Sequence, residues 1–156
     1  MATSNSSSRP IRIGISLCLL GWLLTASSVG GWYQTLAKPS WTPPDSVFGP
    51  VWSTLYFMMA VAAWLVWRGK RSSCRDNALA WFGIQLVLNV AWSGCFFALE
   101  WPGLAFFELL VLLGAIAVAS ATFLRVSRLA AALMLPYLVW CTFAAGLNYS
   151  IWRLNS

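Results

Sequence analysis

The sequence contains no histidine, and this absence excludes several kinds of site. Ser-His-Asp and Cys-His catalysis are ruled out because the general base is missing. Zinc and haem sites of the usual types are also disfavoured, since the four cysteines form no Cys-X-X-Cys pair and three of them lie inside apolar runs. We therefore predict no catalytic residue, no metal and no obligatory cofactor.

Charged residues are scarce as well, at 9% of the chain, whereas a soluble domain carries about 25%. The sequence is 60% hydrophobic and its mean hydropathy is +0.72, which is typical of an integral membrane protein. The net charge of +6 does not indicate nucleic-acid binding, because the basic residues lie between apolar runs and not in one stripe. In that position they are typical of membrane topology signals.

The apolar runs predict an all-α integral membrane protein with a five-transmembrane-helix bundle. A polar tail covers residues 1–12. A single domain over 13–156 follows and contains all five spans, and its first loop, 30–46, forms a lid. Each span is long enough, or nearly so, to cross a hydrocarbon core as a helix. The spans cover residues 13–29, 47–67, 78–99, 101–124 and 129–152. The first also resembles a signal peptide, although the four spans that follow favour an uncleaved segment.

Basic residues divide unequally between the two ends of these spans. The face of the N-terminus receives Arg9, Arg12, Arg68, Lys70, Arg71, Arg75, Arg125 and Arg128, and the opposite face receives Lys38 and Arg153. By the positive-inside rule the N-terminus is cytoplasmic. We expect a bacterial cell membrane, with an outer membrane or the mitochondrial outer membrane as alternatives.

Aromatic residues and prolines are concentrated in the segment 32–52. Pro39, Pro43 and Pro44 prevent most of it from forming a helix or a central strand. A proline-stiffened, aromatic connection loses little further entropy when it settles over a site, so we interpret this segment as a lid. For Trp32 and Trp41, an interfacial aromatic belt is the alternative interpretation.

Three spans each present an aromatic or polar stripe at helical spacing. The stripes consist of Trp52, Tyr56, Met59 and Ala63; of Gln85, Asn89, Trp92 and Phe96; and of Trp140, Phe143, Ala144 and Leu147. An amide such as Asn89 would be left unpaired in lipid, so we expect its side chain to point into the bundle. There it either makes a hydrogen bond to another helix or lines a cavity. The neighbouring large rings and small residues favour an apolar small-molecule pocket. Glu108, inside the fourth span, is either functional or placed at the hydrated interface.

Four ordered motifs resemble the translocator protein family, also called the tryptophan-rich sensory protein or TspO/MBR family. They are WYxxLxKPSWTPP at 32–44, GPVWSTLYFMM at 49–59, a Leu-Asn-Ala-Trp-Phe-Phe pattern over 86–97, and PYLVWxxFAxxLNYxIWRLN at 136–155. The resemblance implies a five-helix bundle, usually a homodimer. The ligands that it implies are porphyrins such as protoporphyrin IX, sterols and benzodiazepine-type drugs.

The resemblance also implies site residues. The ligand pocket would comprise Trp52, Asn89, Trp140 and Ala144, with Tyr33 and Trp41 closing its mouth. The stripes add Tyr56, Trp92 and Phe143. A sterol recognition motif would consist of Leu147, Tyr149 and Arg153, a pattern that is weak by itself.

The function expected is a membrane receptor for flat, largely apolar molecules, with a role in tetrapyrrole regulation or stress response. One alternative is light- and oxygen-dependent breakdown of porphyrin, which the resemblance implies for some bacterial relatives. The sequence supplies no general acid–base groups for dark catalysis, so this would be a side activity. The other alternative, porphyrin or sterol transport, is disfavoured by the lack of paired intramembrane charges and of an inverted repeat.

Overall fold

The structure, a computed structural model, describes residues 31–156. Within this range the secondary structure is helical, without strands: a short 3₁₀ helix η1 (Trp32–Thr35), then α2 (Asp45–Trp67), α3 (Ser73–Ser93), a π-helical turn (Gly94–Ala98), α4 (Pro102–Leu124) and α5 (Arg128–Leu154). Four of the described helices are long and apolar enough to cross a membrane. The predicted first span, 13–29, lies outside the described residues, so the structure shows four such helices where five were expected.

Capping residues explain why two helices begin earlier than the charge-free runs predicted. The Ser72 hydroxyl accepts a hydrogen bond from the Arg75 backbone N–H at 3.2 Å, and the Ser127 hydroxyl accepts one from Ala130 at 3.3 Å. These side chains satisfy N–H groups that the first helical turn leaves unpaired. A helix therefore extends past the apolar run into a polar cap. At the lid, the coil ends at Pro44, so residues 45 and 46 belong to α2 and not to the predicted loop.

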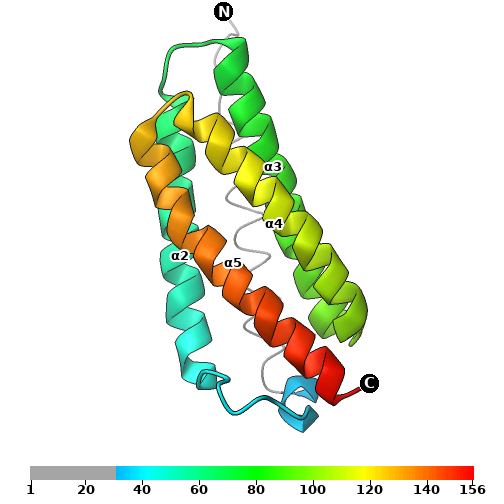
Figure 1. The fold of residues 1–156 in the computed structure, drawn as a ribbon. Helices are drawn as coiled ribbons and strands as arrows, with labels where there is room; N and C mark the ends of the chain where they lie inside the picture. Colours follow the sequence, from blue (N-terminus) through cyan, green and yellow to red (C-terminus); the bar gives the residue numbers. More distant parts are fainter. Residues whose placement is uncertain (1–30) are drawn as a thin grey trace, which may run out of the picture.

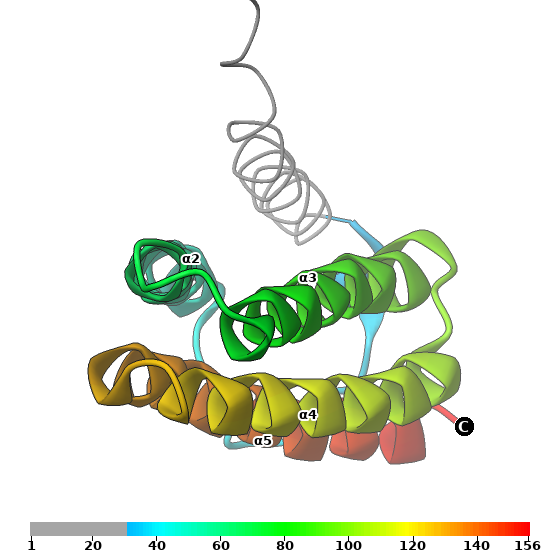
Figure 2. The ribbon, with the colours of Figure 1, turned by 90° about the horizontal axis from the view of Figure 1, so that it is seen from above.

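The helices alternate in direction and lie side by side (Figure 1). α4 packs against α3 and α5, and α2 packs against α5 and α3. The view from above shows α2 beside α3, with α4 and α5 lying together across them (Figure 2). The coil that follows η1 crosses the end of the bundle where α5 terminates (Figure 1). The lid position is therefore at the end opposite the α2–α3 connection.

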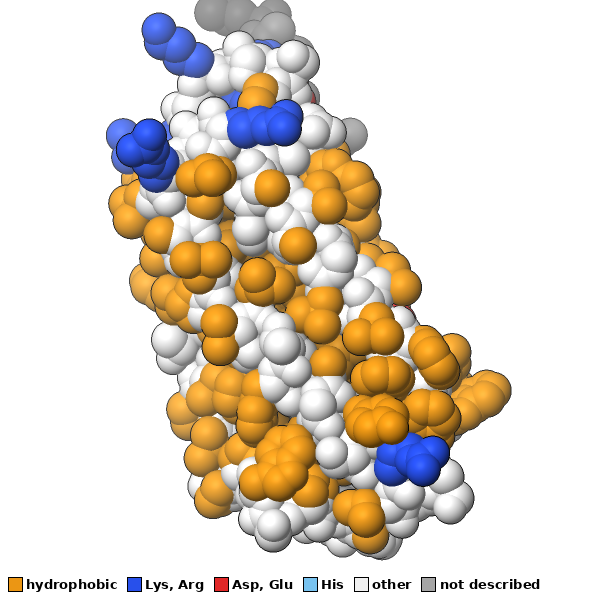
Figure 3. Space-filling view, in the orientation of Figure 1, with side chains coloured by type: hydrophobic (Ala, Val, Ile, Leu, Met, Phe, Trp, Pro, Cys, Tyr) orange, Lys and Arg blue, Asp and Glu red, His pale blue; other side chains and the backbone are white. Residues whose placement is uncertain are grey.

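Lysine and arginine side chains gather at one end of the visible surface. Figure 3 shows them mainly where α2 passes into α3 and α4 into α5, with hydrophobic side chains covering much of the length below. Aromatic side chains such as Phe57 and Phe107 are among the exposed ones. An apolar flank between a strongly basic end and an end with few, balanced charges fits a protein that spans a membrane several times.

α4 and α5 approach each other closely near the lid end. A Cβ placed on Gly103 of α4 would lie 2.9 Å from the indole nitrogen of Trp152 in α5. The absence of a side chain at Gly103 lets the ring sit against the helix backbone. The half-buried Trp152 therefore packs directly against α4.

Candidate functional site

A cavity lies under the lid, between α2, α3 and α5. Its volume is about 40 Å³, and the space free of atoms rises to about 510 Å³ only when the open space at its mouth is counted. Small-molecule sites occupy about 300–1,000 Å³ and are mostly apolar with a few polar groups, so the cavity has the composition of such a site but is smaller than one as it stands. The wall consists of Tyr33, Phe48, Trp52, Trp92, Phe96, Phe97, Trp140, Ala144, Leu147, Asn148 and Ile151.

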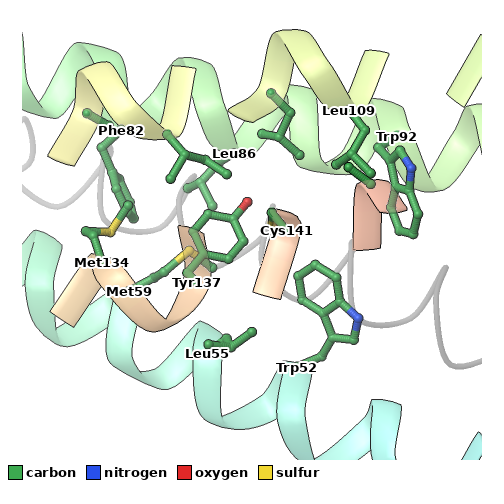
Figure 4. Packing of buried hydrophobic residues seen from close by; sticks show 14 of the residues in the cluster. Trp52, Leu55, Met59, Phe82, Leu86, Trp92, Leu109, Met134, Tyr137 and Cys141 are labelled. Carbon is green, nitrogen blue, oxygen red and sulfur yellow. The ribbon is translucent and has the colours of Figure 1, made fainter. Parts of the chain in front are cut away.

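Aromatic rings from different elements contact one another around this space. Trp52 of α2 and Trp92 of α3 are stacked with centroids 6.5 Å apart, and both reach toward the same region (Figure 4). Trp92 also stacks on Phe96 at 5.6 Å, while Phe48 meets Trp140 edge-on at 6.0 Å. Flat aromatic walls of this kind favour planar, apolar guests that can stack on or pack against them.

The π-helical turn brings two neighbouring phenylalanines to the cavity. Phe96 and Phe97 are consecutive, yet both line the wall, and their rings lie 4.9 Å apart. Consecutive side chains of a regular α-helix point well apart, whereas a π turn changes the local register. Such turns occur frequently at functional sites.

The lid is tied to the end of α5 by a reciprocal pair of hydrogen bonds. The Ala37 backbone N–H donates to the Asn155 side-chain oxygen at 3.0 Å, and the Asn155 amide donates to the Ala37 carbonyl at 2.9 Å. Near the start of the lid, the Gln34 amide donates to the Asp45 carboxylate at 2.5 Å. These contacts hold the loop across the cavity mouth.

Tyr33 is the lid residue that lines the cavity, and it is only 5% exposed. Its ring contacts Phe96 and Phe97 at 6.1 and 6.2 Å. Burial, and secondarily the Asp45 carboxylate, raises the pKa of Tyr33 to about 12. The hydroxyl is therefore protonated at physiological pH and is available as a hydrogen-bond donor.

Asn89 does not line the cavity. Its side-chain oxygen accepts a hydrogen bond from the Tyr56 hydroxyl at 2.7 Å, and its amide donates to the Tyr137 hydroxyl at 3.0 Å. This network joins α3 to α2 and to α5. Of the two interpretations offered by the sequence, the interhelical hydrogen bond describes the contacts present, and a direct ligand contact from Asn89 stays a prediction.

The structure brings together five of the nine predicted pocket residues: Tyr33, Trp52, Trp92, Trp140 and Ala144. Besides Asn89, three others lie behind or beside the wall. Tyr56 stacks on Trp52 at 5.5 Å, and Phe143 packs on Trp140 at 5.3 Å. Trp41 contacts Phe143 at 5.6 Å and is 48% exposed, so it flanks the site and does not line it.

Sequence reasoning did not select five other wall residues as ligand contacts: Phe48, Phe96, Phe97, Asn148 and Ile151. Asn148 is the most informative of them, because it is buried and its side chain joins three helices. Its oxygen accepts a hydrogen bond from the Trp92 indole at 3.2 Å, and its amide donates to the Pro102 carbonyl at 2.7 Å. A signal was available, since Asn148 lies one helical turn beyond Ala144 on the predicted stripe.

The predicted sterol motif does not form one surface. Leu147 is buried and lines the cavity, whereas Tyr149 is 45% exposed and Arg153 is also exposed. Tyr149 instead packs against Phe106 at 5.3 Å on the outside of α4. A sterol that contacts both Tyr149 and Arg153 would therefore bind outside the cavity.

Glu108 is half-buried in the bundle, and its position at a hydrated interface stays a prediction. Both of its carboxylate oxygens are enclosed and have no hydrogen-bond partner in the described part of the chain. The residue is absent from the cavity wall. Its surroundings explain neither a ligand contact nor an ion pair.

Comparison with known proteins places this arrangement in a family. The TspO/MBR family model matches residues 11–153. The chain is 43% identical to the human translocator protein over 80% of its own length and 75% of that protein. It is 38% identical to the tryptophan-rich protein TspO of Chlorobaculum tepidum, over 90% of the chain and 92% of the relative. A tryptophan-rich sensory protein of Cereibacter sphaeroides is 37% identical over 80% of the chain and 77% of the relative. With its membrane-spanning helices and aromatic cavity, the chain belongs to the TspO/MBR family of multi-pass membrane proteins.

Proposed function

We propose that this protein is a membrane receptor that binds porphyrins, with protoporphyrin IX as the representative ligand. The macrocycle would enter between the lid and the helices and lie against the indoles of Trp52, Trp92 and Trp140. It would be held chiefly by aromatic contact and by removal of apolar surface from water. The proposed role is in tetrapyrrole regulation or in a stress response.

The observation that supports this proposal is the composition of the cavity wall. Seven of its eleven residues are aromatic, and they come from the lid, α2, α3 with its π turn, and α5. A flat, conjugated guest can use such a wall more fully than an aliphatic chain can. Within the described residues the wall carries no carboxylate, lysine or thiol, and its polar groups are the Tyr33 hydroxyl, the Asn148 amide and the indole N–H groups.

The test is a titration of the purified protein with protoporphyrin IX, followed by porphyrin absorbance and by tryptophan quenching. Replacing both Trp52 and Trp140 with Phe should weaken binding by about tenfold, since the smaller phenyl rings cover less of the macrocycle and bury less apolar surface. Trp64→Phe is the matched control, because Trp64 is 50% exposed and contacts Arg68 instead of the cavity. Unchanged affinity in the double variant would refute the assignment.

A second candidate function is the light-driven oxidation of bound porphyrin by dioxygen. The observation that favours it is the presence of three indoles on one cavity wall. Excited porphyrin is a photosensitiser, and electron-rich indoles next to it could take part in its oxidation. Illumination in air should then produce a bilin-like absorbance that is absent in the dark, under argon and in the Trp52→Phe/Trp140→Phe variant.

The wider ligand range and the assembly are part of the same proposal. Benzodiazepine-type drugs would share the cavity, and sterols would contact the outer surface at Tyr149 and Arg153. We further propose that residues 13–29 form a fifth span, that the N-terminus is cytoplasmic in a bacterial cell membrane, and that two copies associate. Cross-linking in native membranes tests the homodimer.

A further inference from the structure

The Tyr33 hydroxyl is a buried polar group for which the described residues provide no hydrogen-bond partner. It belongs to a residue that lines an otherwise largely apolar cavity. The other polar side chain on the wall, Asn148, already uses both its oxygen and its amide. Since an unpaired buried hydroxyl is unfavourable, an acceptor supplied by a ligand would stabilise the closed lid.

Lys38 places a positive charge beside the same residue. Its ammonium nitrogen lies 4.2 Å from the centre of the Tyr33 ring, and the side chain is half-buried. Within the described residues the ion pair present is Arg75–Asp76, in the first turn of α3. No carboxylate of these residues therefore lies at ion-pairing distance from Lys38. A half-buried, uncompensated ammonium favours a nearby anion.

Asp45 is the acidic residue whose charge acts on Tyr33. Its carboxylate accepts a hydrogen bond from the Gln34 amide. Its charge contributes to keeping the Tyr33 hydroxyl protonated. Asp45 therefore preserves the donor without bonding to it.

We propose that Tyr33 and Lys38 form a subsite at the cavity mouth for a carboxylate of the ligand. The Tyr33 hydroxyl would donate to a carboxylate oxygen, and the Lys38 ammonium would balance its charge. This inference rests on the proposed function and narrows its ligand class to amphipathic acids, with the flat ring in the cavity and the acid group under the lid.

The experiment compares two ligands that differ only in this group, protoporphyrin IX and its dimethyl ester. The full chain is reconstituted in phospholipid nanodiscs, and both affinities are measured for each variant. In the wild type the diacid should bind about tenfold more tightly than the ester, because hydrogen bonds to charged groups are stronger than those to neutral ones. Tyr33→Phe and Lys38→Gln should each reduce this ratio severalfold, while Lys38→Arg should keep it.

Lys70→Gln is the control, because Lys70 is an exposed lysine in the α2–α3 connection, at the opposite end of the bundle from Lys38. It should leave the ratio unchanged, whereas a drop equal to that in Lys38→Gln would reduce the effect to general surface charge and overturn the subsite. Ester binding reports whether a variant is folded. If Tyr33→Phe loses the ester as well, the ratio in Lys38→Gln decides.

The outcomes separate the two levels of the proposal. If the wild type binds both porphyrins equally, or if its preference persists in both variants, the subsite is refuted while the receptor function stands. If the wild type binds neither porphyrin, the proposed function fails, and the subsite fails with it.

Discussion

Asn89 illustrates how one buried amide can connect three helices. Its oxygen and its amide each bond to a tyrosine hydroxyl, and these tyrosines come from α2 and α5. Tyr137 is completely buried, and its hydroxyl is paired with the Asn89 amide and also with the Cys141 thiol. The amide therefore holds together the helices that carry the cavity wall.

We expect Asn89→Leu to destabilise the protein by about 1–2 kcal/mol, because it removes two interhelical hydrogen bonds, one to Tyr56 and one to Tyr137. Porphyrin affinity should change less than in Trp52→Phe. Denaturant unfolding in detergent and porphyrin titration measure the two effects. Ser120→Ala is the control, since among residues 31–156 Ser120 bonds only to the Ile116 carbonyl of its own helix. A large loss of affinity without a loss of stability would mean that Asn89 contacts the ligand directly.

The enclosure of Tyr33 should also be visible in its titration. Its pKa is raised from 10.0 to about 12, so the native state holds the proton more tightly than the unfolded state does. Its contribution to stability is therefore complete below pH 10.0 and is lost between pH 10.0 and about 12. The tyrosinate absorbance of the wild type minus that of Tyr33→Phe should show a midpoint near 12. A midpoint at the ordinary value would mean that the hydroxyl is open to water.

At the contact between α4 and α5, a small residue, Gly103, lies against a large one, Trp152. Gly103 accommodates the indole of Trp152, and the rigid ring has its nitrogen where a methyl group would intrude. At a second glycine of α4, Gly114, no atom of the described residues lies within 4 Å of the equivalent position. Identical substitutions in one helix should therefore have different consequences.

Gly103→Ala should destabilise the protein by about 1–3 kcal/mol, because the added carbon forces the ring or the helix to shift. Gly114→Ala should be neutral or slightly stabilising, since alanine favours the helix. Thermal unfolding of both variants in the same detergent provides the comparison. Equal midpoints would show that the α4–α5 contact is looser than the structure indicates.

The helical elements were largely predictable from the sequence, but the exact cavity wall was not. Charge-free runs and basic connections indicated α2 to α5, and helical spacing indicated the stripes of Trp52 and Trp92. Periodicity could not predict the π turn, which brings Phe96 and Phe97 to the wall together. Nor could it distinguish Asn89, which bonds to neighbouring helices, from Asn148, which reaches the cavity, because both amides lie on inward faces.

For the molecule as a whole, the basic residues at the α2–α3 and α4–α5 connections mark one side of the membrane. The proposed fifth span then places the two chain termini on opposite sides. With only the four described helices they would lie on the same side. The number of spans therefore has a simple experimental signature.

In Escherichia coli, alkaline phosphatase fused to the C-terminus should be active, because that reporter folds only outside the cytoplasm. Green fluorescent protein fused to the N-terminus should fluoresce, because it requires the cytoplasm. A phosphatase fusion after Arg71, in the α2–α3 connection, is the control and should be inactive. A fluorescent protein that is bright at both termini would contradict five spans.

The two hydrogen bonds between Asn155 and the Ala37 backbone link the C-terminal end of α5 to the lid. Neither residue lines the cavity, so this contact should affect the rates of ligand association and dissociation more than the affinity. Asn155→Ala should accelerate both association and dissociation in stopped-flow experiments, with a much smaller change in the equilibrium constant. A bulky fusion at this end of the chain should have the same effect, which makes the position of an affinity tag a kinetic variable in any binding assay.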